Sequence, residues 1–114
     1  MDRSGECIFC RIVDHRADAS ILYEDEKVVA FHDRYPVAPV HVLVVPRRHI
    51  PSLNEADDPE MLGHLLSTAR SIAEQLGVAA GGYRALINCQ RDGGQVIDHL
   101  HLHVIGGRRL GPMA

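Results

Sequence analysis

The sequence predicts one α+β domain, built from five strands in a largely antiparallel sheet and one long helix. Five short segments are rich in the β-branched, aromatic and other apolar residues typical of strands. One longer stretch, between the third and fourth of these segments, carries apolar residues at helical intervals. Strands grouped before and after a single helix favour an α+β fold. The length of 114 residues suits one domain.

Turn-forming residues separate the expected strands. The charged pair Asp25-Glu26 divides the first strand from the second, and the two prolines of RYPVAPV place a loop after the second. HVLVVP is almost continuously apolar, which predicts a strand covered on both faces. A short helix is expected in CIFCRIVDHR, near the start of the chain. The expected strands span residues 19–26, 27–33, 41–46, 83–89 and 99–105.

The long helix has recognisable ends. Asp58 is a suitable N-cap, Pro59 suits the first turn, and Gly77 follows the last turn. The apolar stripe that should face the sheet consists of Met61, Leu62, Leu65, Leu66, Ala69, Ile72, Ala73 and Leu76.

Composition and charge exclude several classes of protein. The apolar content of 46% and charged content of 24% are those of a globular domain. A net charge of −3 argues against a generic nucleic-acid binder. We find no stretch of about 20 apolar residues for a membrane helix and no signal peptide, so a cytoplasmic protein is expected. Residues 1–114 form one domain in this interpretation, with residues 1–5 loose.

Cys7 and Cys10 have the C-x-x-C spacing. Three cysteines are too few for a disulfide framework in a chain of this size. In a cytosolic protein this spacing indicates a metal or redox site.

Three histidines alternate with apolar residues near the end of the chain. His99, His101 and His103 would project from one face of a strand, because side chains alternate along it. Neighbouring imidazoles would be about 6.7 Å apart at their backbone origins, which suits an extended anionic ligand. Three histidines on a strand can also bind zinc, so the pattern alone leaves catalysis and metal binding open.

The sequence resembles the histidine-triad family over nearly its whole length. HLHLHVI matches that family's alternating histidine signature, and four further stretches occur in the family's order: CIFCRI, FHD followed by P-x-A-P, HVLVVPRRHI, and IN…GGQ. The resemblance is to the nucleotide-binding branch, which hydrolyses adenosine phosphoramidates and aminoacyl adenylates. It implies a HIT-like fold and a homodimer whose sheets continue across the two-fold axis.

The resemblance assigns roles to individual residues. His101 matches the nucleophile, which would form a nucleotidyl-histidine intermediate that water then hydrolyses. His103, His41, Asn88 and Gln95 match positions that donate to the phosphate. Asp33 matches the carboxylate that binds the ribose. The positions that line the base pocket are Ile8, Phe9, Ile12, Phe31, His32 and Leu43.

The resemblance also implies a structural zinc ion. Cys7, Cys10, His49 and His99 match the ligands of many bacterial members of the family. Two thiolates and two imidazoles complete a tetrahedral shell that excludes substrate.

Two alternative functions remain at this point: cleavage of dinucleoside polyphosphates, and non-catalytic nucleotide binding. Val96 replaces a serine that contacts the phosphate in eukaryotic phosphoramidate hydrolases, and Asp98 replaces a residue that is normally aromatic or apolar. The leaving group and the preference between adenine and guanine are therefore left open.

Overall fold

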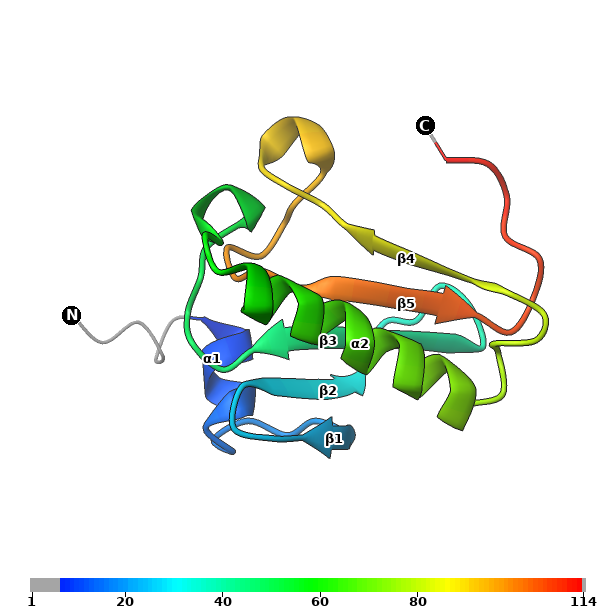
Figure 1. Ribbon diagram of the computed structural model, residues 1–114, viewed down its shortest axis with the longest axis horizontal. Coiled ribbons are helices and arrows are strands. Elements are labelled where there is room, and N and C mark those ends of the chain that lie inside the picture. Colours follow the sequence, from blue (N-terminus) through cyan, green and yellow to red (C-terminus); the bar gives the residue numbers. More distant parts are fainter. Residues whose placement is uncertain (1–6, 114) are drawn as a thin grey trace.

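A computed structural model describes residues 7–113, so the expectation that residues 1–5 are loose lies outside the described residues. Two helices and five strands are arranged as an antiparallel sheet with a helix on each face (Figure 1). The strand order is β1-β2-β3-β5-β4. The elements are α1 (Ile8–Val13), β1 (Ile21–Glu24), β2 (Val28–His32), β3 (Val40–Pro46), α2 (Pro59–Gln75), β4 (Tyr83–Ile87) and β5 (Leu102–Gly106). Two short 3₁₀ turns cover Leu53–Glu55 and Arg91–Gly93.

The interior strands β2 and β3 are buried on both faces, which the continuous apolar pattern of HVLVVP predicts for β3. One face packs under α2, where Leu65 and Ile72 meet Val42 and Val44. The opposite face packs under α1, and its residues are Phe9, Ile12, Val13, Val29, Phe31, Leu43 and Val45. The sheet therefore separates two apolar layers.

The predicted ends of α2 are confirmed. The Asp58 carboxylate accepts hydrogen bonds from the amides of Glu60 and Met61, 3.0 and 3.4 Å away. Gly77 follows the helix with φ of +76°, a conformation that glycine adopts without steric cost. Leu66 departs from the predicted stripe: it is 57% exposed, because it lies at the edge of the apolar arc rather than over the sheet. Among residues 7–113, no helix is long and apolar enough to span a membrane.

The segment that carries the three alternating histidines (residues 99–103, called the histidine segment below) begins before strand β5. β5 starts at Leu102, so His99 and His101 precede the sheet ladder, contrary to the expected strand over 99–105. The reason is that the Leu100 amide donates to the Ile50 carbonyl, 2.7 Å away, instead of joining the ladder. The alternation of faces persists nevertheless: Leu100 and Leu102 lie in the core under α2, whereas the His99 and His101 rings contact Phe9 of α1.

Candidate functional site

A cavity of about 830 Å³ opens on the α1 side of the sheet. This volume is within the usual range of small-molecule sites. Its walls come from α1, β2, β3 and the histidine segment. The predicted residues that line it are Ile8, Phe9, Ile12, Phe31, His32, Asp33, Leu43, His101 and His103. The cavity thus brings together the residues predicted to bind the base, the carboxylate predicted to bind the ribose, and two of the three alternating histidines.

His101 lies at this cavity with one ring nitrogen bound to the backbone. Its Nδ1 is 2.7 Å from the His99 carbonyl oxygen. Because a carbonyl oxygen only accepts, Nδ1 carries the proton and Nε2 keeps its lone pair. Burial lowers the pKa of His101 below the ordinary 6.5, although the His99 carbonyl and the Asp33 charge act in the opposite direction. The ring is therefore neutral at neutral pH and offers the lone pair of Nε2 to the cavity.

His103 has the opposite tautomer, which a chain of hydrogen bonds sets. The Val37 amide donates to His41 Nδ1, 3.2 Å away, so the proton of a neutral His41 ring is on Nε2. His41 Nε2 is 2.9 Å from His103 Nδ1, to which it donates. His103 consequently keeps its own proton on Nε2. His41 does not line the cavity, and it acts on the site through His103.

Burial keeps both rings of this pair neutral. It lowers the pKa of His41 below 6.5, although the nearby charge of Asp33 opposes the shift. Burial, followed by the neighbouring His101 and His41 rings, lowers the pKa of His103 to about 4. Asp33 Oδ2 is 3.4 Å from His41 Nε2, so the carboxylate adjoins the pair.

Asn88 and Gln95 do not line the cavity. Asn88 Nδ2 donates to the Gly93 carbonyl at 2.7 Å. Gln95 Nε2 donates to the carbonyls of Pro51 and Ile97, at 2.7 and 2.9 Å. The Asn88 amide therefore holds the Gly93-Gly94 loop, and the Gln95 amide joins the end of this loop to the backbone at Pro51. Their role as phosphate donors stays a prediction.

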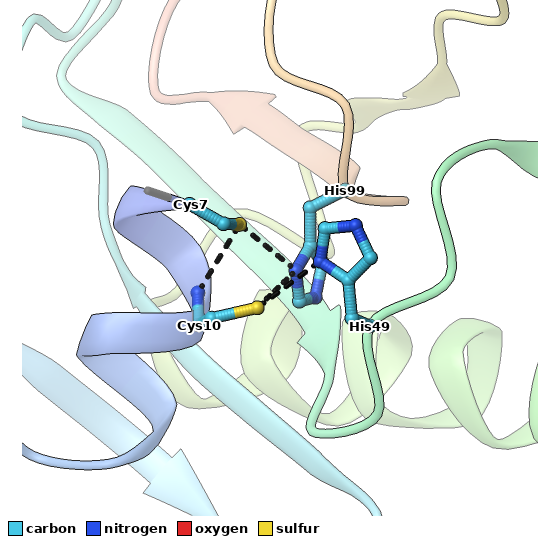
Figure 2. Close-up of side chains that lie close together, drawn as sticks. All are labelled: Cys7, Cys10, His49 and His99. Atoms are coloured by element: carbon cyan, nitrogen blue, oxygen red, sulfur yellow. Dashed lines mark hydrogen bonds between the residues drawn. The ribbon is translucent and has the colours of Figure 1, made fainter. Parts of the chain in front are cut away.

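The third alternating histidine, His99, belongs to a separate cluster with Cys7, Cys10 and His49 (Figure 2). One potential ligand atom from each of these residues lies within 4.8 Å of all the others. The Cys10 sulfur is 3.1 Å from His49 Nδ1 and 3.5 Å from His99 Nδ1, and the Cys7 sulfur is 3.4 Å from His99 Nδ1. The start of α1, the loop after β3 and the histidine segment meet at this cluster.

The donor set fits a tetrahedral zinc ion. Bonds of about 2.3 Å to sulfur and 2.0–2.1 Å to nitrogen separate sulfur and nitrogen ligands by about 3.6 Å at the tetrahedral angle. The observed separations of 3.1, 3.4 and 3.5 Å are within 0.5 Å of this value. His99 Nε2 is 2.9 Å from the Pro46 carbonyl oxygen, which directs the proton to Nε2 and leaves Nδ1 for a metal.

A protein-family model matches most of the chain. The model of the HIT domain matches residues 14–110, which include all three alternating histidines. The chain belongs to the HIT family. Its match to this family begins after Cys7 and Cys10, so the two thiols lie outside the matched region.

Individual HIT proteins are similar over most of their length. The purine nucleoside phosphoramidase of Escherichia coli strain K12 is 44% identical over 110 residues, which cover 95% of this chain and 92% of that protein. A histidine triad protein from Clostridium difficile superimposes with a TM-score of 0.92 at 40% identity, with full coverage of both chains. A zinc-bound histidine triad family protein from Mycobacterium smegmatis has a TM-score of 0.83 at 32% identity, covering 92% of this chain and 77% of that one.

The cavity of this HIT protein also has walls that the sequence analysis missed. Arg34, Tyr35 and Ile97 lie within two positions of residues that were identified, so adjacency in sequence was a usable signal. Val96 also lines the cavity, at the position that the sequence analysis named for its replacement of a serine. Residues 18–20 carried no such signal, because only strand pairing brings them to the cavity. The lining residues that were missed are Asp18, Ala19, Ser20, Arg34, Tyr35 and Ile97.

Proposed function

We propose that this protein is a purine nucleoside phosphoramidase that cleaves phosphoramidates and acyl-nucleotides at the α-phosphate through His101. The observation that carries the proposal is the buried His101 ring, which is 5% exposed and lines the cavity while its Nδ1–H is held by the His99 carbonyl. This arrangement leaves Nε2 as a nucleophile of fixed direction. The activity named for the similar E. coli protein supports the same reaction.

The reaction has two displacements at phosphorus. Nε2 of His101 attacks the α-phosphorus and forms a nitrogen–phosphorus bond, while the bond from phosphorus to the leaving amine breaks. Water then displaces His101 and releases the nucleoside monophosphate. Overall, the two steps consume one water molecule. The amine gains a proton and phosphorus gains a hydroxyl. The Val96 side chain cannot donate a proton to the leaving amine, so this proton comes from His103, which is replenished from solvent, or directly from solvent.

His103 has a different task from His101 in this mechanism. Its Nε2–H donates to a phosphoryl oxygen, whose negative charge grows during attack. His41 keeps that proton in place by donating to His103 Nδ1. Asp33 accepts from the ribose hydroxyls, and the purine lies between the apolar side chains of α1 and those of β2 and β3.

A second cavity provides room for the leaving group. It measures about 740 Å³ and shares Ile8, Val96 and Ile97 with the nucleotide cavity. Two adjoining spaces suit a substrate with two parts, a nucleotide and an amine or acyl group.

Steady-state release of AMP from an adenosine phosphoramidate tests the proposal. The wild type should turn over and His101→Ala should lose turnover, while His15→Ala, whose ring pairs with Glu24 on the surface, should retain it. Mass spectrometry of quenched wild type should detect a nucleotidyl adduct on His101. Turnover that persists in His101→Ala contradicts the mechanism. Turnover of dinucleoside polyphosphates in preference, or AMP binding without turnover of either substrate, would favour the respective alternative function.

We also propose that Cys7, Cys10, His49 and His99 hold a structural zinc ion. The Cys₂His₂ donor set and its spacing support this assignment, as does the zinc-bound relative from M. smegmatis. When bound, the ion would connect α1 to the histidine segment. Thiolate ligands require a reducing compartment, so we place the protein in the cytoplasm.

We further propose a homodimer joined at β4. Within the described residues β4 pairs only with β5, so one of its edges is open to a second strand. The other edge of the sheet is less suitable, because β1 has four residues and an irregular register.

A further inference from the structure

The cavity extends from the nucleophile across the sheet to the segment that precedes β1. His101 and His103 lie at β5, Leu43 is on β3, Phe31 is on β2, and residues 18–20 line the far end. In the strand order β1-β2-β3-β5, three strand spacings separate the two ends, which is about 14 Å. The His32 amide donates to the Ser20 carbonyl at 3.0 Å and so holds the far segment against β2.

The proposed reaction sets the orientation of a nucleotide in this cavity. The α-phosphate must be near His101, and Asp33 is the carboxylate available to the ribose. The purine then lies against Phe9, Ile12 and Phe31, which offer no polar atoms from their side chains. The polar edge of the base therefore reaches the far end, where Asp18, Ser20 and the neighbouring His32 have polar side chains.

Asp18 is suited to distinguish one purine from the other. Its side chain has no hydrogen bond or ion pair with residues 7–113, so its carboxylate oxygens are available to a ligand. An ionised carboxylate can only accept hydrogen bonds. Guanine presents two adjacent donors, N1–H and the N2 amino group, whereas adenine presents an acceptor at N1. The Ser20 hydroxyl both donates and accepts, and a neutral imidazole such as that of His32 has one donor and one acceptor nitrogen, so neither group discriminates between the two bases.

We propose that Asp18 accepts hydrogen bonds from N1–H and N2–H of guanine and makes this enzyme prefer guanosine over adenosine substrates. The inference rests on the proposed function, since it places the α-phosphate at His101. Paired contacts to a base edge discriminate by roughly 5- to 150-fold. Asp18 is exposed to water, which weakens such contacts, so we expect a preference of about tenfold, near the lower end of that range.

Equilibrium binding of GMP, IMP and AMP to the wild-type protein tests the proposal directly. We expect GMP to bind about tenfold more tightly than AMP. IMP should be intermediate, because hypoxanthine retains N1–H but lacks the N2 amino group. The same order should appear in kcat/KM for the guanosine, inosine and adenosine phosphoramidates.

Asp18→Asn should reduce the ratio of GMP to AMP affinity to about one, because its amide offers a donor to adenine as well as an acceptor to guanine. Asp14→Asn is the matched control. Asp14 is also exposed, pairs with Arg16 and does not line the cavity, so this variant should keep the wild-type ratio. The control makes the same change in net charge.

Equal binding of the three nucleotides by the wild type would overturn the proposal, as would an unchanged ratio in Asp18→Asn. Loss of the proposed function is distinguishable from these outcomes. If the wild type turned over no phosphoramidate, the proposed function would fail, while the binding ratios would still decide whether Asp18 selects guanine.

Discussion

His101 and His103 are two residues apart and face the same cavity, but they carry their protons on opposite ring nitrogens. A backbone carbonyl holds the proton of His101 on Nδ1, whereas the hydrogen bond from His41 leaves the proton of His103 on Nε2. The first ring therefore offers a lone pair and the second a donor. The Val37 amide starts this second chain of hydrogen bonds.

At the residue scale, His41 is a positioning residue whose replacement should change the tautomer of His103. His41→Ala removes the donor to His103 Nδ1, so ¹⁵N NMR should show a mixture of tautomers at His103. We expect kcat to fall by up to ~10²-fold, the lower end of the cost of removing one such phosphate donor. His41→Gln should restore both the tautomer and part of the rate, since its amide can donate in the same direction. The surface variant His15→Ala should change neither property.

A merely structural role for His41 predicts a different pattern. The His103 tautomer would then be unchanged in His41→Ala, and any loss of rate would follow loss of stability. That result would remove His41 from the mechanism.

Individual residues also mark the limit of prediction from sequence. Alternation along the chain predicted the face occupied by each histidine, but it contained no information on which ring nitrogen carries the proton. Which ring nitrogen carries the proton depends on the His99 carbonyl and the Val37 amide, and the fold positions both groups. Gln95 illustrates the same limit, since its amide bonds the Pro51 carbonyl, 44 positions away in the sequence.

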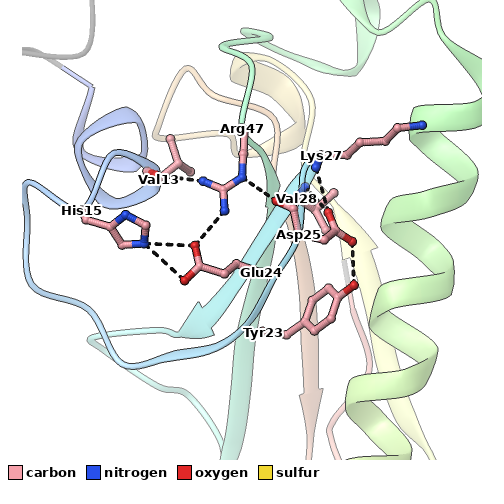
Figure 3. A network of polar contacts seen from close by, with 8 residues as sticks. All are labelled: Val13, His15, Tyr23, Glu24, Asp25, Lys27, Val28 and Arg47. Atoms are coloured by element: carbon pink, nitrogen blue, oxygen red, sulfur yellow. Dashed lines mark hydrogen bonds and ion pairs between the residues drawn. The ribbon is translucent and has the colours of Figure 1, made fainter.

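At the scale of elements, a polar network fastens the β1–β2 turn to its neighbours (Figure 3). Arg47 donates to the Val13 carbonyl at the end of α1, to the Asp25 carbonyl and to the Glu24 carboxylate. The Asp25 carboxylate accepts from Tyr23 and from two turn amides, and it pairs with His64 of α2 at 2.7 Å. The turn therefore connects both helices to the sheet.

Asp25→Asn should destabilise the fold in a manner that depends on pH. Burial by itself raises the pKa of Asp25, but the hydrogen bonds from Tyr23, the Lys27 and Val28 amides and His64 together hold it well below the ordinary 3.8. A depressed pKa stabilises the folded state above the unfolded pKa, and this contribution is lost as pH falls below about 4. We expect a loss of about 1–3 kcal/mol at pH 7.

Chemical denaturation at pH 7, 4 and 2.5 measures this effect. The difference in unfolding free energy between wild type and Asp25→Asn should shrink as pH falls. Asp92→Asn is the control, because that carboxylate is 89% exposed and pairs only with Arg91 beside it. A difference that is constant with pH would show that the ionised form of Asp25 is not what stabilises the turn.

A zinc ion held by Cys7, Cys10, His49 and His99 should also stabilise the fold, because it would connect α1 to the histidine segment. A metal present at about a thousand times its dissociation constant contributes about 4 kcal/mol of stability. Cys7→Ala should therefore lose zinc by elemental analysis and unfold at lower temperature. Cys7→Ser separates the two roles of this residue, because it retains an oxygen to cap α1 but is a poor zinc ligand. Cys89→Ala lies outside the cluster and should keep both zinc and stability.

Well under one zinc per wild-type chain would contradict the assignment. Equal melting temperatures of wild type with and without a chelator would show that any bound ion is not structural.

Elements were predictable where their signals are local. The ends of α2 depend on Asp58, Pro59 and Gly77, which act on neighbouring backbone groups, and the burial of β3 follows from its apolar composition. The start of β5 depends instead on the Leu100 amide, which bonds the distant Ile50 carbonyl. The cavity wall at residues 18–20 likewise requires the pairing of β1 with β2.

At the scale of the whole molecule, the resemblance to the HIT family predicted an arrangement that local patterns did not contain. The strand order β1-β2-β3-β5-β4 leaves β4 on the outside, although it precedes β5 in the chain. In this fold α1, the histidine segment and the Asp33 carboxylate line one cavity on the same side of the sheet. It also leaves an open strand edge and an exposed Leu66 on α2, which together suggest a surface for a second copy.

Leu66→Glu should therefore convert a homodimer into a monomer. A charge placed in an apolar contact loses solvation without gaining a partner, and obligate dimers depend on such contacts. Sedimentation should give twice the chain mass for the wild type and a single chain mass for the variant, with unchanged circular dichroism. Ser71→Glu adds the same charge about 140° away around the helix and should remain dimeric. A monomeric wild type would refute the homodimer, and a dimeric Leu66→Glu would exclude α2 from the interface and leave β4 as the element to test.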